Sequence, residues 1–309
     1  MEQKHLILIG APVDCGKRTA GCLMGPDAYR TAGLGNAFTS LGHRVTDIGN
    51  LTPDVDQTDQ PDGTRHYKLA ENIGWTKSLA QSAQTHAPKG FPVFMGGDHA
   101  LALGTVSGMA AYAKSVGRPL FVLWLDAHSD FHTMETTDSG NLHGTPVAYF
   151  TGRDGFEGFP KVEAPVPAEN ICMIGLRSVD PAERAALAET DMQLVDMRAI
   201  DELGISGPLS KFLDRVRAAN GLLHVSLDVD FIDPAAAPGV VTTVPGGATV
   251  REAHLVMEML CDSDLVCSLD LVELNPFLDE RGRTANLMVD LAASLLGRRV
   301  FDRPTRSHL

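Results

Sequence analysis

Short and nearly continuous apolar segments recur along this chain, and they constrain its fold more than any other feature. The most apolar of them cover residues 5–12, 91–95, 119–125, 171–176, 222–227 and 265–274, and shorter ones cover 44–48 and 193–196. Segments of this kind are typical of strands that are buried on both faces, as in a parallel sheet. The sequence therefore predicts a mostly parallel sheet of about eight strands.

Helical patterns separate these strands. We expect a helix that begins near residue 25, one that ends near 86, and others that cover 100–116, 181–189, 209–219, 253–260 and 288–295. The last two segments have the apolar i, i+3, i+4, i+7 spacing of amphipathic helices. The alternation predicts helices on both faces of the sheet, although a TIM barrel has the same alternation. We expect one domain over residues 1–309, with a polar surface excursion at 50–64.

The charge and the cysteine pattern argue against several classes of protein. A formal net charge of −13 disfavours a general binder of nucleic acid or of anionic membranes. The first apolar run is too short for a signal peptide, and no apolar stretch approaches the ~18 residues of a membrane span. The five cysteines show no CxxC spacing. We therefore expect a cytoplasmic protein with reduced thiols.

Three of the apolar segments lead into side chains that can bind metals. The candidate ligands are His99, Asp126, His128, Asp130, Asp228 and Asp230. Period-2 spacing places Asp126, His128 and Asp130 on one side of the chain. Because ligands bind beyond the carboxyl ends of parallel strands, the three groups are expected to meet at one edge of the sheet. The sequence thus predicts a polynuclear metal site there.

The ligand set indicates which metals it would bind. Four carboxylates and two imidazoles exceed what one structural zinc needs. They suit two harder ions, with Mn²⁺ the best fit and Co²⁺, Fe²⁺ or Zn²⁺ as substitutes. Two ions roughly 3.5–4 Å apart would hold a water between them and lower its pKa towards ~7. A lone aspartate at a strand end is more often a turn residue, but turns do not explain six ligands at three strand ends.

Several motifs resemble the signatures of the ureohydrolase superfamily, and within it those of arginases. They are Gly-Gly-Asp-His at 96–99, Asp-Ala-His-Ser-Asp at 126–130, Ser-Gly-Asn-Leu-His-Gly at 139–144, Asp-Val-Asp at 228–230 and Glu-Leu-Asn-Pro at 273–276. The resemblance extends over nearly the whole chain. It implies a three-layer α/β/α fold, a pair of Mn²⁺ ions and hydrolysis of an amidine with release of urea.

The resemblance also implies how the ligands are shared. One ion would be bound by His99, Asp126, Asp130 and Asp228, and the other by Asp126, His128, Asp228 and Asp230. Asp126 and Asp228 would then bridge the two ions. A hydroxide between the ions would attack the guanidinium carbon, and Asp130 would accept a hydrogen bond from it.

Two further residues are expected to take part in the reaction. His143 matches the family's proton-transfer histidine, and an imidazole titrates in the range that protonation of a leaving amine requires. The alternative is a loop histidine with structural hydrogen bonds. Glu273 ends the last strand, where its carboxylate would orient the guanidinium, and a buried structural ion pair is the alternative.

The expected substrate contacts come from the same resemblance. They are His132, Ser139, Asn141, Asp180, Glu183 and Thr242. Ser139 and Asn141 belong to a hydroxyl- and amide-rich loop that would bind an α-carboxylate. Asp180 and Glu183 match residues near the α-amino group, but their spacing also makes a good helix cap. His132 stands where many arginases have an asparagine, so we expect a variant carboxylate site.

Together these patterns predict a manganese-dependent arginase that converts L-arginine and water into L-ornithine and urea. The nearest alternative is another ureohydrolase, an agmatinase, a guanidino-acid hydrolase or a formiminoglutamase. A binuclear phosphoesterase would need cationic phosphate contacts, and the metal-bearing strand ends carry none apart from Arg177. A non-catalytic metal-binding protein is the remote alternative. The expected partner is a small guanidino compound, without nucleic acid or membrane, and the resemblance implies a homo-oligomer, a trimer or hexamer.

Overall fold

A computed structural model describes residues 3–55, 65–299 and 301 of the chain. Most of the predicted excursion at 50–64 lies outside the described residues. In the described part of this excursion, Asn50 is the last residue of a strand and residues 51–55 have no regular structure.

Eight strands form one parallel sheet in the order β2-β1-β3-β8-β7-β4-β5-β6. The strands are β1 (His5–Ala11), β2 (Arg44–Asn50), β3 (Phe91–Gly96), β4 (Leu120–Leu125), β5 (Ile171–Leu176), β6 (Gln193–Asp196), β7 (Leu222–Asp228) and β8 (Val266–Val272). The predicted strands are confirmed. The sheet has two edge strands, β2 and β6, so among the described residues it is an open sheet and the TIM barrel is wrong.

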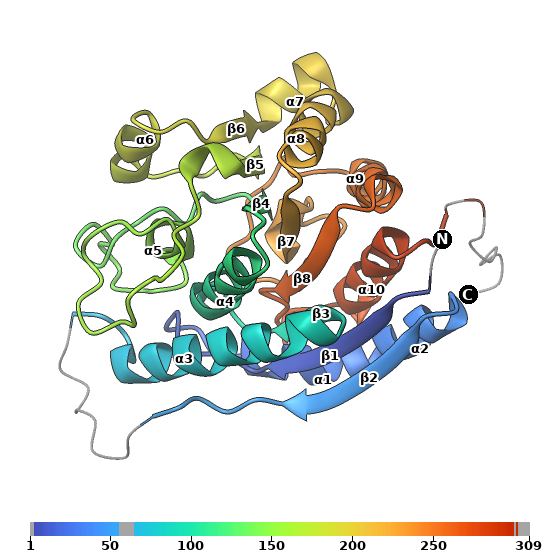
Figure 1. Cartoon of the computed structure of the whole chain (residues 1–309), viewed down its shortest axis with the longest axis horizontal. Helices are drawn as coiled ribbons and strands as arrows, with labels where there is room; N and C mark the ends of the chain where they lie inside the picture. The colour runs from blue at the N-terminus through green and yellow to red at the C-terminus, as the bar shows by residue number, and fades with distance from the viewer. Residues whose placement is uncertain (1–2, 56–64, 300, 302–309) are drawn as a thin grey trace.

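The strands are apolar throughout because both faces of the sheet are covered. In β1, Leu6 and Leu8 face one hydrophobic core, whereas Ile7 and Ile9 face the other. Helices α3 (Leu69–His86), α4 (Ala102–Ser115), α5 (Pro146–Phe150) and α6 (Pro181–Leu187) pack on the second core. The first core is covered by α1 (Gly25–Thr31), α2 (Leu34–Ser40), α7 (Met197–Leu203), α8 (Ser206–Ala218), α9 (Val250–Ser263) and α10 (Arg283–Leu295). Figure 1 shows α3 and α4 on one side of the sheet and α9 and α10 on the other, the expected three layers.

Three local features differ from the sequence-based expectation, and one of them is the short helix α5, which was not predicted. The helix predicted to begin near residue 25 is divided into α1 and α2 by Gly33, whose φ of 84° is left-handed and accessible to glycine without strain. Helix α7 was not predicted because it buries only Ile200 and so has no apolar stripe. Asp196 begins this helix by accepting a hydrogen bond from the backbone N–H of Ala199.

The order of the central strands positions the functional site. β3, β8, β7 and β4 are consecutive neighbours and run parallel, so their carboxyl ends lie side by side at one edge of the sheet. Three of the four lead into predicted ligands, and the fourth, β8, leads into Glu273. Residues that are far apart in the sequence therefore converge without any one loop having to bring them together.

Candidate metal centre

Two of the predicted ligands, Asp126 and Asp228, also shape the turn that follows their strand. Asp126 comes directly after β4, and its Oδ1 accepts a hydrogen bond from the backbone N–H of His128 at 2.7 Å. Asp228 ends β7, and its Oδ1 accepts one from the N–H of Asp230 at 2.7 Å. Each aspartate thus fixes a turn that carries the next ligand to the same side. His99 begins a 3₁₀ turn (His99–Leu101) after β3.

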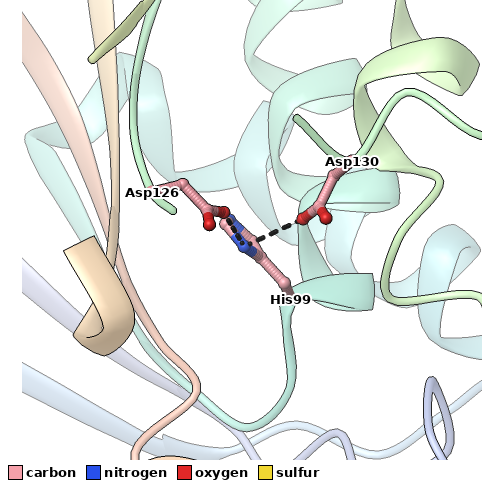
Figure 2. A group of neighbouring side chains, drawn as sticks. All are labelled: His99, Asp126 and Asp130. Atoms are coloured by element: carbon pink, nitrogen blue, oxygen red, sulfur yellow. Dashed lines mark ion pairs between the residues drawn. The ribbon is translucent and has the colours of Figure 1, made fainter. Parts of the chain in front are cut away.

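The six predicted ligands lie in one cluster with two centres. Nδ1 of His99 is 3.0 Å from Asp126 Oδ2, 3.2 Å from Asp130 Oδ2 and 3.0 Å from Asp228 Oδ2. Figure 2 shows the carboxylates of Asp126 and Asp130 facing the same edge of the His99 ring. These four residues are the set predicted to bind one ion, and three of them have ligand atoms within 4.8 Å of one another.

The second centre surrounds His128. Its Nδ1 is 3.4 Å from Asp126 Oδ1 and 3.1 Å from Asp230 Oδ2. Asp126 therefore directs one carboxylate oxygen to each imidazole, which is the geometry of a bridging ligand. Asp228 directs one oxygen to His99, and its other oxygen accepts the backbone N–H described above.

The charges of the cluster call for cations at both centres. Burial opposes a charge on His99, but the facing carboxylates outweigh it and raise the pKa of this imidazole well above its ordinary value. The same balance raises the pKa of His128 to about 12. Burial and the neighbouring aspartates raise the pKa of Asp228 and Asp230. Protonated imidazoles and divalent cations both meet this need for positive charge.

Two buried atoms indicate that the side chains of the cluster are arranged to bind metal ions and not to hydrogen-bond one another. Nδ1 of His99 and Oδ2 of Asp126 have no hydrogen-bond partner, although they are almost wholly buried. Nε2 of the same histidine is engaged by Ser226 Oγ at 2.8 Å, which leaves Nδ1 for a ligand bond. Oxygen-rich sites with imidazoles suit divalent ions of the Mn²⁺ type. The cluster is thus fit for a binuclear metal site.

A pocket of about 340 Å³ opens above the cluster. All six predicted ligands line it, and so do the predicted residues His132, Ser139, Asn141, His143, Asp180, Glu183 and Thr242. Among the described residues, the lining contains neither lysine nor arginine. Phosphate contacts of the kind that a binuclear phosphoesterase needs are therefore missing from this wall.

Glu273 is the one predicted site residue that does not line the pocket. Its side chain is buried behind His143, and its Oε1 lies 3.2 Å from His143 Nδ1. Oε1 also accepts a hydrogen bond from the backbone N–H of His99 at 2.9 Å. Oε2 forms an ion pair with Lys17, a residue that the sequence analysis missed. The structure therefore has the buried ion pair that was the alternative to guanidinium binding.

The loop with Ser139 and Asn141 forms one wall of the pocket. Ser139 Oγ accepts a hydrogen bond from the backbone N–H of Asn141 at 3.2 Å. Oδ1 of Asn141 is buried without a hydrogen-bond partner, so this oxygen can accept a hydrogen bond from a ligand. Arg65 holds the loop from outside by donating to the backbone carbonyls of Glu135 and Thr137, each at 3.1 Å.

A second part of the pocket lining is acidic. Glu183 Oε2 accepts the backbone N–H of Asp180 at 3.0 Å, and the two residues form the capping box of α6. Glu183 is buried, and its Oε1 accepts hydrogen bonds from Ser129 Oγ and from the backbone N–H of Phe131. Nε2 of His132 lies 3.2 Å from Asp180 Oδ2, while its Nδ1 faces Thr136. The helix-cap interpretation is confirmed, and Asp180 still presents its carboxylate to the pocket.

Thr242 lies at the side of the second centre. Its hydroxyl donates a hydrogen bond to Asp230 Oδ2 at 3.0 Å. The loop that carries it is fastened by Arg177, which donates to the backbone carbonyls of Val244 at 2.8 Å and of Asp230 at 2.5 Å. This guanidinium, noted in the sequence as an isolated cation near the strand ends, is therefore occupied by carbonyl groups.

The open parallel sheet and the imidazole–carboxylate cluster at its carboxyl edge define an α/β enzyme with a site fit for two metal ions. A sequence model of the arginase family matches residues 4–297. The arginase of Brucella melitensis is 60% identical over 305 residues, which cover 98% of this chain and 100% of that protein. The chain belongs to the arginase family and is a hydrolase of that family.

Solved structures agree with this assignment. The arginase of Bacillus caldovelox has a TM-score of 0.89 and 34% identity, over 96% of this chain and 100% of that one. The formimidoylglutamase of Bacillus subtilis has a TM-score of 0.75 and 21% identity, over 96% of this chain and 87% of that one. The second likeness concerns the fold alone, so the substrate must be argued from the pocket.

Proposed function

We propose that this protein hydrolyses L-arginine to L-ornithine and urea. The observation that carries the proposal is one pocket with a binuclear cluster at its floor and the Ser139–Asn141 loop on its wall. A guanidinium is planar and cationic, and four carboxylates at the floor favour it. The other end of the substrate is then within reach of neutral donors on one wall and of Asp180 on the other. The names of the full-length relatives support the same activity.

The metal ions are assigned to the six clustered residues. In this proposal one ion is bound by His99, Asp126, Asp130 and Asp228, and the other by Asp126, His128, Asp228 and Asp230. The predominance of oxygen ligands supports Mn²⁺, with Co²⁺, Fe²⁺ or Zn²⁺ as substitutes. Two such ions supply Lewis acidity and a water of lowered pKa.

The residues of the chain provide the rest of the chemistry. His143 lines the pocket, and one nitrogen of its ring faces Glu273. The opposite edge of the ring is therefore free to give a proton to the amine that leaves as the C–N bond breaks. Thr242 fixes the orientation of Asp230 by its hydrogen bond and lies where a guanidinium nitrogen would pass.

In this proposal, two parts of the pocket wall recognise the α-carboxylate and α-amino groups of the substrate. Ser139 and Asn141 would bind the α-carboxylate through a hydroxyl and an amide, since the pocket lining offers it no lysine or arginine among the described residues. Asp180, whose side chain is 73% exposed, would bind the α-amino group, with Glu183 holding it in place. His132 lies between the walls and links them through Thr136 and Asp180.

The test is urea release from the Mn²⁺-loaded protein with L-arginine and agmatine assayed side by side. Arginine turnover that greatly exceeds agmatine turnover would support both the chemistry and the loop assignment. The double variant Ser139→Ala, Asn141→Ala should raise KM for arginine far more than for agmatine, which lacks the carboxylate. An equal loss for both substrates would overturn the carboxylate assignment, and turnover of agmatine instead would make the protein an agmatinase.

The remaining assignments complete the proposal. We infer a single domain over residues 1–309, a cytoplasmic location and a homo-oligomer, a trimer or hexamer, as the resemblance to arginases implies. In support, none of the five cysteines, all of which are described, forms a disulfide. No helix in the described part of the chain is long and apolar enough to cross a membrane. Light scattering on the purified protein would test the oligomer.

A further inference from the structure

Lys17 is the buried cation behind the catalytic pocket. It lies in the loop between β1 and α1, and its side chain is 3% exposed. Among the described residues no other lysine or arginine is buried to this degree. Its ammonium group forms an ion pair with Glu273, whose side chain is 1% exposed.

A buried lysine needs a specific partner to remain charged. Burial by itself lowers the pKa of Lys17, but the charge of Glu273 outweighs it and raises this pKa above its ordinary value. Burial likewise opposes a charge on Glu273, and Lys17 outweighs it and holds the pKa of this carboxyl well below its usual range. The pair therefore stays ionised. Buried pairs of this kind seldom add stability over an apolar pair, so the pair calls for another explanation.

The contacts of Glu273 indicate what the pair does. Oε2 of the Glu273 carboxylate forms the ion pair with the ammonium group of Lys17. Oε1 accepts a hydrogen bond from the backbone N–H of His99 and faces Nδ1 of His143. The carboxylate is saturated by these groups and lies behind the pocket wall. It is thus placed to orient His143.

The same loop also holds the backbone of His143. The carbonyl oxygen of Gly16 accepts hydrogen bonds from the N–H of Leu142 at 2.7 Å and from that of His143 at 3.0 Å. Adjacent residues of one loop therefore hold His143 in two ways, the main chain through Gly16 and the side chain through Lys17 and Glu273. Both contacts join segments more than 120 residues apart in the sequence.

We propose that Lys17 is a positioning residue for His143. By pairing with Oε2 of Glu273, it holds this carboxylate in place as the acceptor for Nδ1–H of His143 and so directs Nε2 of the ring into the pocket. When the C–N bond of the substrate breaks, its electron pair stays on the amine nitrogen, which takes the proton from Nε2. The imidazole then regains a proton from water. This inference rests on the proposed function, in which His143 protonates the leaving amine.

The test compares Lys17→Met, which removes the charge at similar length, with Lys17→Arg, which keeps it. Lys77→Met, on the exposed face of α3, is the matched control. We expect Lys17→Met to lower kcat about 100-fold, the size of a general-acid contribution, with KM for arginine and metal content unchanged. Lys17→Arg should recover most of kcat. An unchanged kcat, whether or not KM rises, would overturn the proposal, because His143 would then deliver its proton equally well without Lys17.

A second measurement does not depend on turnover. ¹⁵N NMR of the histidine side chains should report protonated Nδ1 in His143 of the wild-type protein and a change of this signal in Lys17→Met. If that variant does not fold, Glu273→Gln should produce the same change and the same loss of kcat. An unchanged His143 signal would overturn the proposal. Absence of urea release by the wild-type protein would instead refute the proposed function and leave the NMR result to decide the role of Lys17.

Discussion

The imidazole of His99 lies flat against the indole of Trp124, with ring centroids 4.1 Å apart and an angle of 2° between the planes. Trp124 belongs to β4, and Ser226 on the neighbouring strand β7 is bonded to Nε2 of the same imidazole at 2.8 Å. The ring is therefore fixed both in its plane and in its rotation. The only free nitrogen, Nδ1, faces the carboxylates of the first centre.

Loss of the Ser226 hydroxyl should weaken metal binding at this centre. In Ser226→Ala the imidazole keeps its stacking on Trp124 but loses the partner that fixes its tautomer. Such outer contacts are typically worth about 10–100-fold in metal affinity, so we expect a loss of that size for the ion bound by His99. Calorimetric titration of the metal-free protein with Mn²⁺ would measure it. Ser268→Ala is the control, since Ser268 is equally buried and bonded to a different histidine, His224, and an equal loss there would contradict the prediction.

Removal of the metal ions should destabilise the protein strongly. Without cations, the buried carboxylates of Asp126, Asp130, Asp228 and Asp230 repel one another at short distance. A ligand present at 100 times its Kd adds about 2.7 kcal/mol, which corresponds to about 4 °C in Tm for a chain of this size. Differential scanning calorimetry before and after EDTA treatment would show this drop. An unchanged Tm, with metal loss verified by elemental analysis, would count against the site.

The metal-free protein should lose stability as the pH rises from 6 to 8. The folded-state pKa of His128, about 12, lies above the ordinary ~6.5 of the unfolded chain. Above pH ~6.5 the unfolded chain releases this proton while the folded protein keeps it, so the stabilisation that is complete below pH ~6.5 declines as the pH rises. Burial and the charge of Asp126 raise the pKa of Asp130 to about 6, above the unfolded value of ~3.9. Asp130 therefore loses its contribution mainly between pH ~4 and ~6, whereas above pH ~6.5 His128 keeps its proton only in the folded state, so stability falls as the pH rises to 8.

Urea denaturation of the EDTA-treated protein at several pH values would test this sign. The Mn²⁺-loaded protein is the control, because metal displaces the same protons and its stabilising effect grows with pH. The difference in midpoint between loaded and metal-free protein should therefore widen from pH 6 to pH 8. A constant difference would show that the imidazoles of the cluster do not exchange protons for metal.

The sheet and the ligands could be predicted because their signals are local. An apolar strand followed by Asp126 or by Asp228 identifies both a buried strand and its carboxyl end, and parallel topology then brings the ends together. The capping box at Asp180 and Glu183 is equally local, since its residues are three apart. In each case the physical cause lies within a few residues of the pattern.

The groups that support the site could not be predicted in this way. Lys17 contacts a carboxylate 256 positions away, and a lysine in a glycine-rich loop is usually exposed to water. The partner of Glu273 depends on how that loop folds back over β8. The φ values of Asp130 and Glu273, 46° and 67°, are left-handed for residues with a side chain, and only the surrounding contacts impose them. Such contacts become visible only with the tertiary structure.

Arg65 should control substrate affinity without taking part in the reaction. Its guanidinium joins the carbonyls of Glu135 and Thr137 and so holds the loop that carries Ser139 and Asn141. In Arg65→Met the loop keeps its sequence but loses these charged hydrogen bonds, worth about 1 kcal/mol at an exposed site, and KM for arginine should rise about five-fold.

The value of kcat should change little in Arg65→Met, because neither the cluster nor His143 contacts this residue in the hydrogen bonds described. Steady-state kinetics would be measured for Arg65→Met and for the control Arg217→Met, which removes an exposed arginine on α8. The comparison separates loss of the hydrogen bonds to the loop from the general effect of losing one charge. Agmatine provides a further comparison, since its KM should be nearly unaffected if the loop binds the α-carboxylate. A fall in kcat at constant KM would place the loop in the chemical step instead, because an affinity contact alone cannot produce that pattern.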